Sequence, residues 1–580
     1  MSDRANEREA SFVSGSSAQD LPETSGGLVS LRRQQRGELL TNIRERRFQD
    51  ELNTDSSQPL FGSGHNPGAF SKIIPDSELQ RSIEGLSSND PQVVLNMLVV
   101  LRKYLLQDQN KSTQQTSDVF SPLIQNFINA GAVGPVLNII KLSQSEQILE
   151  EAAWVITNVA CGTRDQCDFL MKSGVVPALK TCLTHSSMKC RAQALWAFSN
   201  LALTSTTYVR VIANEHIFLM FPPSFYKPAS PLTTTQLRIL QLTGALAPTL
   251  SEPEFKDDAI RVLPFLVDVI HPAYPTVISS SLQTLGGILN NQTLIDQINF
   301  HKLSNSLTKI LHGTFDLHPN KVNLAQIMER ALGLVGQMCQ SDKCIEYFLH
   351  SRILSALSTT MCSVNEQIRK KTAFALGNIS AGTASHKDMI LRTDIVKQYV
   401  QSFETEKPNT QSDILIFFMN LSATPSATVP FLTEGVIQLC MSQVRSSNHA
   451  STELLVIRNQ NMSLTILENV LKFLPRIQPA SATTIIKLFE DHDIIPIIEQ
   501  LRGSSSKQTQ TISERICRNW TIIKEYGVSS IITDDPPRNI QSRAPISFGQ
   551  PGPFTATPVP MSQIQLQNPF QTTFRPNDNK

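Results

Sequence analysis

One phrase occurs twice in the chain, and it restricts the fold more than any other feature. Ala-Ala-Trp-Val-Ile-Thr-Asn-Val-Ala places Trp154 four residues before Asn158, and Ala-Leu-Trp-Ala-Phe-Ser-Asn-Leu-Ala places Trp196 four residues before Asn200. The two asparagines are 42 residues apart. Side chains four residues apart on a helix lie one turn apart on the same face. The phrase therefore predicts two equivalent helices, each presenting an indole ring and a carboxamide together.

The segment between the two copies predicts a turn and a further helix. It contains Gly174 and, three residues later, Pro177. Glycine commonly ends a helix, and proline is favoured in the first turn of the next one. Gly131 and Pro135 repeat this punctuation upstream. The repeating unit is thus helix, turn, helix, and a period of 42 residues is typical of armadillo or HEAT repeats.

Further copies of the asparagine position can be placed along the chain by their spacing. With about 450 residues at a period near 45, roughly ten repeats fit. Such repeats stack on their neighbours into a superhelix with a long concave groove. We therefore expect an all-α solenoid. The later positions are Gly244, Gly287, Gln337, Asn378, Asn420 and Asn469.

Composition excludes several classes of protein. The 580 residues exceed one hydrophobic core, and the net charge of +1 gives no global field for nucleic acid or membrane. The nine cysteines contain no C-x-x-C pair, so no metal site is expected. The N-terminal residues lack an apolar segment, and no apolar run approaches a membrane span. We expect a cytosolic or nuclear protein without membrane insertion, direct nucleic-acid binding or cofactor.

The sequence divides into five segments by composition. Ser-rich and Pro-rich stretches without helical periodicity cannot bury a core. The nine prolines of the C-terminal segment place it in this class. The predicted segments are a disordered N-terminus (1–26), a basic arm (27–53), a flexible linker (54–76), the repeat solenoid (77–530) and a disordered tail (531–580).

The basic arm and the tail each leave two interpretations open. From residue 31 to residue 47 the arm has six arginines against two glutamates. It is either a solvated basic helix or an arm that carries positive charge to an acidic partner. The isolated phenylalanines of the tail are either docking points or unselected residues. The arm arginines are Arg32, Arg33, Arg36, Arg44, Arg46 and Arg47, and the tail phenylalanines are Phe548, Phe554, Phe570 and Phe574.

The repeated tryptophan and asparagine side chains can hold an extended peptide. A carboxamide offers a donor and an acceptor together, so it can match the C=O and N–H of one peptide unit. Indole faces can line slots for the stems of Lys or Arg and attract the cation by about 0.5–2 kcal/mol. In the alternative interpretation, Trp154 and Trp196 are core residues that join adjacent helices.

These motifs resemble importin-alpha, the adaptor that carries basic nuclear localisation signals to importin-beta. The resemblance covers about residues 27–526, weakly between 205 and 320. It implies a right-handed superhelical solenoid of armadillo repeats. The segments that carry it are EEAAWVITNVACGT and QALWAFSNLA (second and third repeats), FINAGAVGPV from Phe127 (first), KKTAFALGNISAG from Lys370 (seventh) and LTILENVLK from Leu464 (ninth).

The resemblance also implies partners and sites. Importin-beta would bind the basic arm, cargo proteins with basic localisation signals would bind the groove, and an export receptor would bind the C-terminal repeats. The protein would move between cytoplasm and nucleus. The implied major cargo site is Trp154, Asn158, Gly162, Trp196 and Asn200, and the implied minor site is Phe374, Asn378, Asp413 and Asn420.

Three positions depart from the family pattern. Thr204 stands where the family has an aspartate that pairs with the key lysine of the signal, Cys167 replaces a threonine, and Lys371 replaces a glutamate. Losing one charge-assisted bond costs about 1.5–3 kcal/mol. The arm also lacks the family's second basic cluster, since it ends in Gln-Asp-Glu-Leu-Asn at Asn53. We therefore expect weak binding of conventional basic signals and weak self-inhibition.

The sequence is compatible with two function classes. The first is an importin-alpha-like nuclear import adaptor with changed or restricted cargo. The second is an armadillo-repeat scaffold in adhesion or signalling, without transport activity. An enzyme is not expected, because H-E-x-x-H, G-x-S-x-G and G-x-x-x-x-G-K-[ST] are all missing from the sequence.

Overall fold

The computed structural model describes residues 74–106, 122–289, 292–314, 323–446 and 454–531. Within these ranges the regular secondary structure is helical, without a strand. The predicted disordered N-terminus, the basic arm and nearly all of the predicted linker and tail lie outside them.

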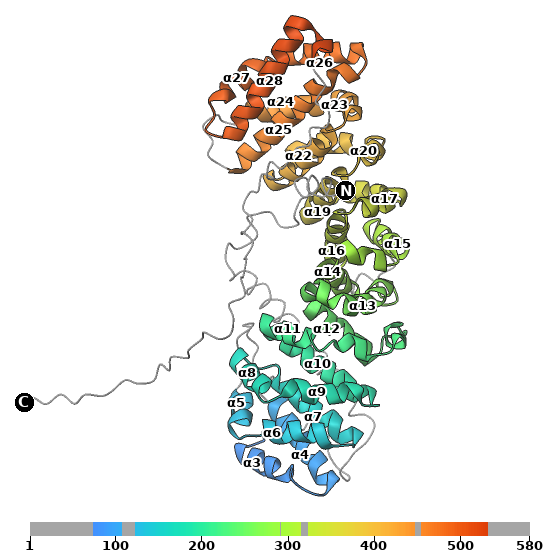
Figure 1. Cartoon of the computed structure of the whole chain (residues 1–580), viewed down its shortest axis with the longest axis vertical. Helices are drawn as coiled ribbons and strands as arrows, with labels where there is room; N and C mark the ends of the chain where they lie inside the picture. The colour runs from blue at the N-terminus through green and yellow to red at the C-terminus, as the bar shows by residue number, and fades with distance from the viewer. Residues whose placement is uncertain (1–73, 107–121, 290–291, 315–322, 447–453, 532–580) are drawn as a thin grey trace, which may run out of the picture. The chain divides into compact units, whose positions relative to one another are not determined.

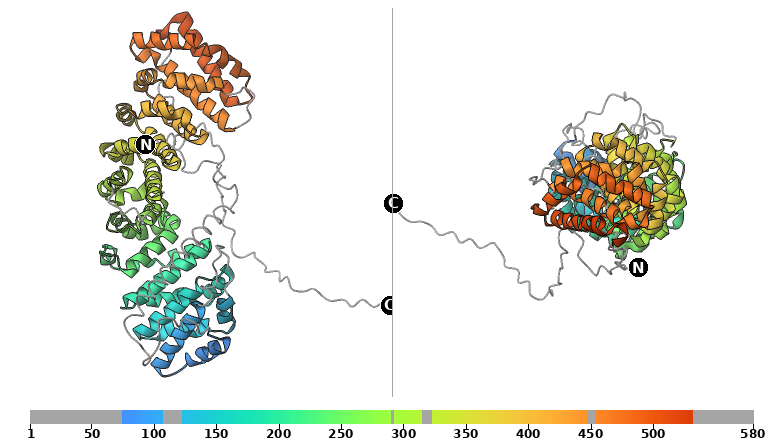
Figure 2. Two further views of the ribbon diagram at one scale, coloured as in Figure 1. Left: turned by 180° about the vertical axis from the view of Figure 1, so that it is seen from behind. Right: turned by 90° about the horizontal axis from the view of Figure 1, so that it is seen from above.

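The long helices follow one another as a ladder (Figure 1). In the described part of the chain each member packs against the next, and the view from behind shows the same succession (Figure 2). We call these members the helix ladder. They are α4 (Pro91–Leu106), α7 (Glu146–Val159), α10 (Met188–Thr204), α12 (Thr234–Leu250), α14 (Ile278–Ile288), α16 (Leu324–Met338), α19 (Glu366–Ser380), α22 (Pro408–Ser422), α25 (Leu454–Phe473) and α28 (Lys507–Tyr526).

Shorter helices connect the members of the ladder and cover one side of them. The α-helices among them are α3 (Asp76–Gly85), α5 (Pro122–Asn129), α6 (Val133–Leu142), α8 (Arg164–Lys172), α9 (Val175–Thr184), α11 (Thr206–Ala213), α13 (Lys256–Asp268), α15 (Phe300–Leu311), α17 (Asp342–His350), α18 (Ile353–Met361), α20 (Ala384–Leu391), α21 (Ile395–Ser402), α23 (Thr428–Thr433), α24 (Val436–Ser446), α26 (Pro479–Asp491) and α27 (Ile494–Gln500). The 3₁₀ turns are η2 (Ile217–Met220), η3 (Pro223–Tyr226), η4 (Pro253–Phe255), η5 (Gln292–Gln297), η6 (Phe403–Thr405), η7 (Pro425–Ala427), η8 (Leu474–Arg476), η9 (Leu501–Gly503) and η10 (Val528–Ser530).

Glycine at positive φ makes the sharp turn between the two shorter helices of a repeat. Gly174 has φ of 83° directly before α9, and Pro177 is the third residue of that helix. Gly131 has φ of 75° ahead of α6, where Pro135 is again the third residue. A side chain is strained in this conformation, so glycine is the residue that the turn requires.

The core runs along the whole array between the ladder and the shorter helices. Aliphatic and aromatic side chains from every repeat are buried there, among them Tyr104, Phe198, Phe265, Phe348 and Phe418. Neighbouring repeats share this core, so none buries its apolar face alone. The predicted all-α solenoid of about ten repeats is confirmed, since the ladder supplies one long helix per repeat.

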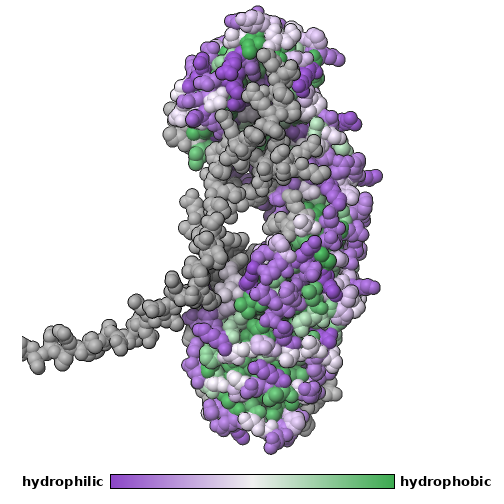
Figure 3. Space-filling view, viewed as in Figure 1, coloured by the Kyte–Doolittle hydropathy of each residue, from purple (hydrophilic) through white to green (hydrophobic). Residues whose placement is uncertain are grey.

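The surface mixes polar and apolar side chains (Figure 3). Hydrophilic side chains cover most of the face shown, with hydrophobic ones among the N-terminal helices. No single described helix is long and apolar enough to cross a membrane. Two bent pairs pass the same length and composition criteria, namely Pro122–Asn129 with Val133–Leu142 and Pro408–Ser422 with Pro425–Thr433.

Candidate functional site

Asparagine side chains occupy equivalent positions on the helix ladder, and we call Asn158, Asn200, Asn378 and Asn420 the amide row. In three of them the Nδ2 atom donates to a backbone carbonyl of the preceding ladder helix. The acceptor is each time the residue just before the corresponding position of that helix. The bonds are Asn200 to Thr157 at 3.2 Å, Asn378 to Gly336 at 3.1 Å and Asn420 to Gly377 at 2.9 Å.

At the first two members of the amide row, polar atoms remain unmatched. Asn158 is fully buried, and neither its Oδ1 nor its Nδ2 has a hydrogen-bond partner within the described ranges. The Oδ1 of Asn200 and the Nε1 of Trp154 are also buried without a hydrogen-bond partner within these ranges. A buried polar group without a partner costs about 1–3 kcal/mol. A peptide unit from another segment would supply the missing donor and acceptor.

The ring of Trp154 is already in contact with a cation of the same chain. The Cζ atom of Arg102, on α4, lies 4.1 Å from the ring centroid. Glu151, three residues before Trp154, holds this guanidinium through an Oε2 to Nε distance of 2.7 Å. Both charged side chains are largely buried, so their attraction is screened less than that of a surface pair.

Trp196 also stacks on an arginine, but this arginine comes from the following ladder helix, whereas Arg102 comes from the helix before Trp154. The Cζ atom of Arg238, on α12, lies 3.4 Å from the centroid of its ring. Arg238 donates from a terminal nitrogen to Oε1 of Gln241 at 2.8 Å. Trp196 is only 4% exposed, whereas Trp154 is half-buried. The indole faces that were expected to receive Lys or Arg of an incoming segment therefore stack on the chain's own arginines.

Arg102 and Arg238 are not among the site residues predicted from the sequence. A signal for Arg238 was present, because it stands 42 residues after Trp196, one full period along the chain. No comparable spacing identifies Arg102, since the segment 107–121 separates its helix from the following repeat.

Gly162 lies in the tight turn between α7 and α8. A Cβ atom there would be 2.5 Å from Oε1 of Gln166. Gln166 and Thr163 form a reciprocal capping box at the start of α8. Gly162 thus permits the close approach that this cap requires.

Two of the positions that depart from the family pattern lie next to each other. The Sγ atom of Cys167, on α8, is 3.8 Å from the Oγ1 atom of Thr204, at the end of α10. Thr204 donates to the carbonyl of Asn200 at 3.0 Å. At this end of the amide row the chain therefore places a thiol beside a hydroxyl and has no carboxylate at either position.

The residues of the implied minor site lie on α19 and α22, which pack together. Phe374 is 5% exposed, and its ring lies against Gly336, where a Cβ atom would be 2.4 Å from Cε1 of the ring. The Nζ atom of Lys371 is 5.9 Å from the ring centroid. The aromatic ring of this site, like the two indoles, has a cation of the same chain beside it.

Asp413 lies half-buried on α22 among cations from neighbouring helices. Burial raises the pKa of this carboxyl from 3.8 to about 6, although Arg458, Lys370 and Lys371 act to lower it. The structure thus groups the predicted residues into two sets. Trp154, Asn158, Gly162, Trp196 and Asn200 belong to α7, its following turn and α10, whereas Phe374, Asn378, Asp413 and Asn420 belong to α19 and α22.

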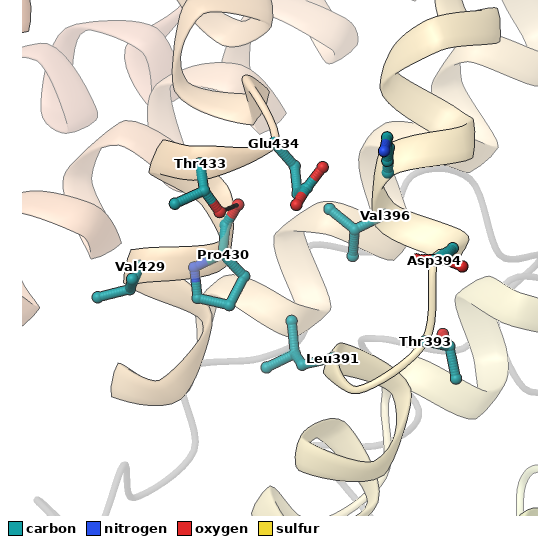
Figure 4. A pocket seen from close by; sticks show the side chains of 9 residues that line it. Leu391, Thr393, Asp394, Val396, Val429, Pro430, Thr433 and Glu434 are labelled. Carbon is teal, nitrogen blue, oxygen red and sulfur yellow. Dashed lines mark hydrogen bonds between the residues drawn. The ribbon is translucent and has the colours of Figure 1, made fainter.

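The hollow between α21 and α23 is lined by none of the residues in these two sets. It has a volume of about 180 Å³, and its lining side chains include Leu391, Asp394, Val396, Pro430 and Glu434 (Figure 4). It is smaller than typical ligand pockets of about 300–1,000 Å³. In the part of the chain that the structure describes, no three His, Cys, Asp or Glu side chains are grouped to hold a metal. The predicted arm residues Arg32, Arg33, Arg36, Arg44, Arg46 and Arg47 lie outside that part.

Comparison with known proteins gives the following similarities. Residues 120–161 and 163–203 match the Armadillo/beta-catenin-like repeat. Importin subunit alpha-6 of Arabidopsis thaliana is 28% identical over 179 residues, 30% of this chain and 29% of that protein. Importin subunit alpha-9 of the same organism is 21% identical over 386 residues, 63% of this chain and 66% of that protein. The chain therefore spans less than a third of the first relative and just under two thirds of the second.

One solved structure supports the fold independently. An engineered protein of known crystal structure superposes with a TM-score of 0.59 and 17% sequence identity, covering 77% of this chain and 99% of that one. At this level of identity the similarity shows the fold alone.

Proposed function

We propose, from the premise that this armadillo-repeat chain is a divergent relative of the importin-alpha subunits, that it is a nuclear import adaptor. It binds an extended segment of a cargo protein along the amide row and importin-beta through the basic arm of residues 27–53. Its cargo differs from that of conventional adaptors.

The observation that carries this proposal is the set of unmatched amide atoms on α7 and α10. Asn158 and the Oδ1 of Asn200 are buried on adjacent ladder helices, in line with the half-buried Trp154. If these asparagines had a purely structural role, we would expect each buried side-chain atom to have a hydrogen-bond partner within the fold. An extended main chain laid across these helices offers one N–H and one C=O per residue, which is the complement that the amides lack.

The remaining assignments follow from the adaptor role. An importin-alpha-like adaptor is not an enzyme and needs no cofactor. It moves between cytoplasm and nucleus, and an export receptor engages its C-terminal repeats. Cargo proteins with basic signals belong to its partners, with conventional signals bound weakly because Thr204 and Lys371 stand in place of acidic residues.

A scaffold without transport activity is the second candidate. It is favoured by the bonds from Asn200, Asn378 and Asn420 to carbonyls of the preceding helices, because these bonds give the amide row a structural use. In that case the row would join repeats, and the arm would have no importin-beta to bind.

Binding of purified importin-beta to the full chain separates the two candidates. We expect measurable binding that falls by at least about tenfold when Arg32, Arg33, Arg46 and Arg47 become alanine, because surface charge pairs across an interface contribute jointly. The matched control is N158A/N200A, which alters the cargo row and should leave importin-beta binding within about twofold. Undetectable binding to the unmodified chain, or equal binding by the arginine variant, would contradict the adaptor proposal and favour the scaffold.

A further inference from the structure

Three of the described helices, α8, α12 and α20, begin with a capping box that a threonine opens. The third residue of the helix completes each box, and it is Gln166 in α8 and Gln236 in α12, but His386 in α20. This side chain accepts a hydrogen bond from the backbone N–H of the threonine. Glutamine is neutral at every pH, whereas an imidazole changes its charge between about pH 5 and 8. Of these three boxes, the one in α20 therefore contains a titratable group.

The buried ring of His386 uses both of its nitrogen atoms. Nδ1 lies 3.2 Å from the backbone nitrogen of Thr383, and Nε2 lies 2.6 Å from Oε2 of Glu346 on α17. A backbone N–H can only donate, so Nδ1 must present its lone pair to Thr383. The proton of the neutral ring is then on Nε2, which donates it to Glu346.

A second proton on the ring would occupy the atom that makes the cap. An Nδ1–H would face the N–H of Thr383, and two donors cannot form a hydrogen bond with each other. The ring would keep its bond to Glu346 and lose its bond to Thr383. In α8 the acceptor for the N–H of Thr163 is Oε1 of Gln166, at 2.9 Å, and this amide oxygen remains an acceptor in acid.

The acidic side chains of α17 can accept hydrogen bonds from the protonated ring. Oδ1 of Asp342 lies 4.0 Å from Nδ1, so a small rotation of the ring would direct a new N–H towards this carboxylate. Hydrogen bonds from His386 and His350 hold the pKa of Glu346 below its usual range, so this carboxylate stays ionised in mild acid. Both protonation states of His386 thus have an acceptor on α17, whereas the bond to Thr383 exists only in the neutral state.

The other elements that pack on α20 bring few charged groups towards it. Helix α19 has no charged residue after Lys371, and α21 contains Lys397, which is exposed. The charged residues of α20 besides His386 are Lys387 and Asp388, and Asp388 accepts a hydrogen bond from Ser426 of η7. The carboxylates that lie within 4.0 Å of the ring therefore come from α17.

We propose that His386 is a pH-sensitive cap, in which protonation of Nδ1 releases Thr383 and loosens the start of α20. The turn concerned follows α19, the helix that carries Asn378 of the amide row. It has the same tight geometry as the turn before α8. A Cβ atom at Gly382 would be 2.6 Å from Nδ1 of His386, as one at Gly162 would be 2.5 Å from Oε1 of Gln166. This inference goes beyond the proposed function and applies equally to an adaptor and to a scaffold.

The test is hydrogen–deuterium exchange of the full chain at about pH 5.5 and about pH 7.5, on either side of the range in which imidazoles titrate. Mass spectrometry follows the segments that begin α20 and α8, after correction for the intrinsic effect of pH on exchange. The Gln166 box of α8 is the internal control. We expect exchange at the start of α20, relative to α8, to be at least about threefold faster at the lower pH, because a lost cap weakens the first turn of a helix.

Matched variants assign this response to one ring. H386Q gives α20 the same box as α8, and we expect it to reduce the pH response to less than about 1.5-fold. H350Q removes the other imidazole bound to Glu346 and should keep the response. The inference is overturned if α20 and α8 respond equally to pH in the unmodified chain, or if H386Q keeps the response. The first comparison needs no variant, so it decides the matter even if H386Q fails to fold.

Discussion

The guanidinium carbon of Arg238 lies 3.4 Å from the centroid of the Trp196 ring. The same relationship joins Arg102 to Trp154 at 4.1 Å, again with the cation and the ring on adjacent ladder helices. Each contact contributes about 0.5–2 kcal/mol by cation–π attraction. The rings thus help to hold neighbouring repeats together, and a basic side chain from outside could stack on the same ring face only by displacing the resident arginine.

Removing Arg238 should expose the face of Trp196 to a ligand. We expect R238A to bind a Lys-rich peptide about three- to tenfold more tightly than the unmodified chain, since a ring face becomes available and one repelling charge is lost. Anisotropy with the labelled peptide measures this. R238K is the control, because it keeps the charge, and it should gain little. Equal affinities for R238A and the unmodified chain would show that the ring is sealed by other contacts.

The pair of Arg102 and Glu151 should couple in stability. Both side chains are largely buried and 2.7 Å apart, so removing one leaves the other charge poorly compensated. We expect E151A and R102A each to destabilise by about 1–3 kcal/mol, and the double variant by less than their sum. Chemical denaturation of all four proteins completes the cycle. Strict additivity would mean that the pair makes no net contribution.

Replacing Gly336 by alanine should force the ring of Phe374 to move. A Cβ atom at Gly336 would be 2.4 Å from the Phe374 ring, whereas at Gly333, on the same helix, it would meet nothing within 4 Å. We expect G336A to lower stability by about 1–3 kcal/mol through overpacking, and G333A to raise it by up to about 1 kcal/mol through helix propensity.

Thermal unfolding of the two glycine variants tests this difference. F374L in the G336A background should recover part of the loss, since the smaller side chain leaves room for the new methyl group. Equal Tm values for G336A and G333A would contradict the close contact.

The sequence predicted the repeat and its turns well, because both depend on local rules. Positive φ at Gly174 and the register of Trp154 with Trp196 follow from residues close in the chain. Arg102 and Arg238 were missed because their positions depend on how one repeat stacks on the next. The stacking of two repeats depends on the segment that connects them, and some of these segments are irregular. The connection between α11 and α12, which contains η2 and η3, is an example.

The hydrogen bonds made by the side chains of the amide row could not be predicted from the sequence either. An asparagine on a helix face predicts a donor and an acceptor, but not which atoms the fold itself uses. The structure shows that Nδ2 of Asn200, Asn378 and Asn420 is used between repeats. The sign of the charge around Asp413 was partly visible in Lys371, whereas Arg458 joined it only through the packing of α22 and α25.

Asp413 should make the stability of the chain depend on pH. Burial raises the pKa of its carboxyl from 3.8 to about 6 in the folded protein, against the influence of Arg458, Lys370 and Lys371. The folded state therefore holds the proton more tightly than the unfolded state. The stability linked to this proton is fully present below pH 3.8 and is lost as the pH rises through about 6.

D413N removes this dependence, because asparagine is neutral at every pH. We expect the variant to be more stable than the unmodified chain by about 1–2 kcal/mol at pH 7.5, with the difference vanishing near pH 4. Tyr399 also interacts with Asp413, but burial raises its pKa well above 10, so it stays neutral throughout this range. Denaturation at several pH values measures the difference, and D388N, at another aspartate, is the control. A D413N chain that is less stable at pH 7.5 would show that the attraction of the three cations outweighs burial at this carboxylate.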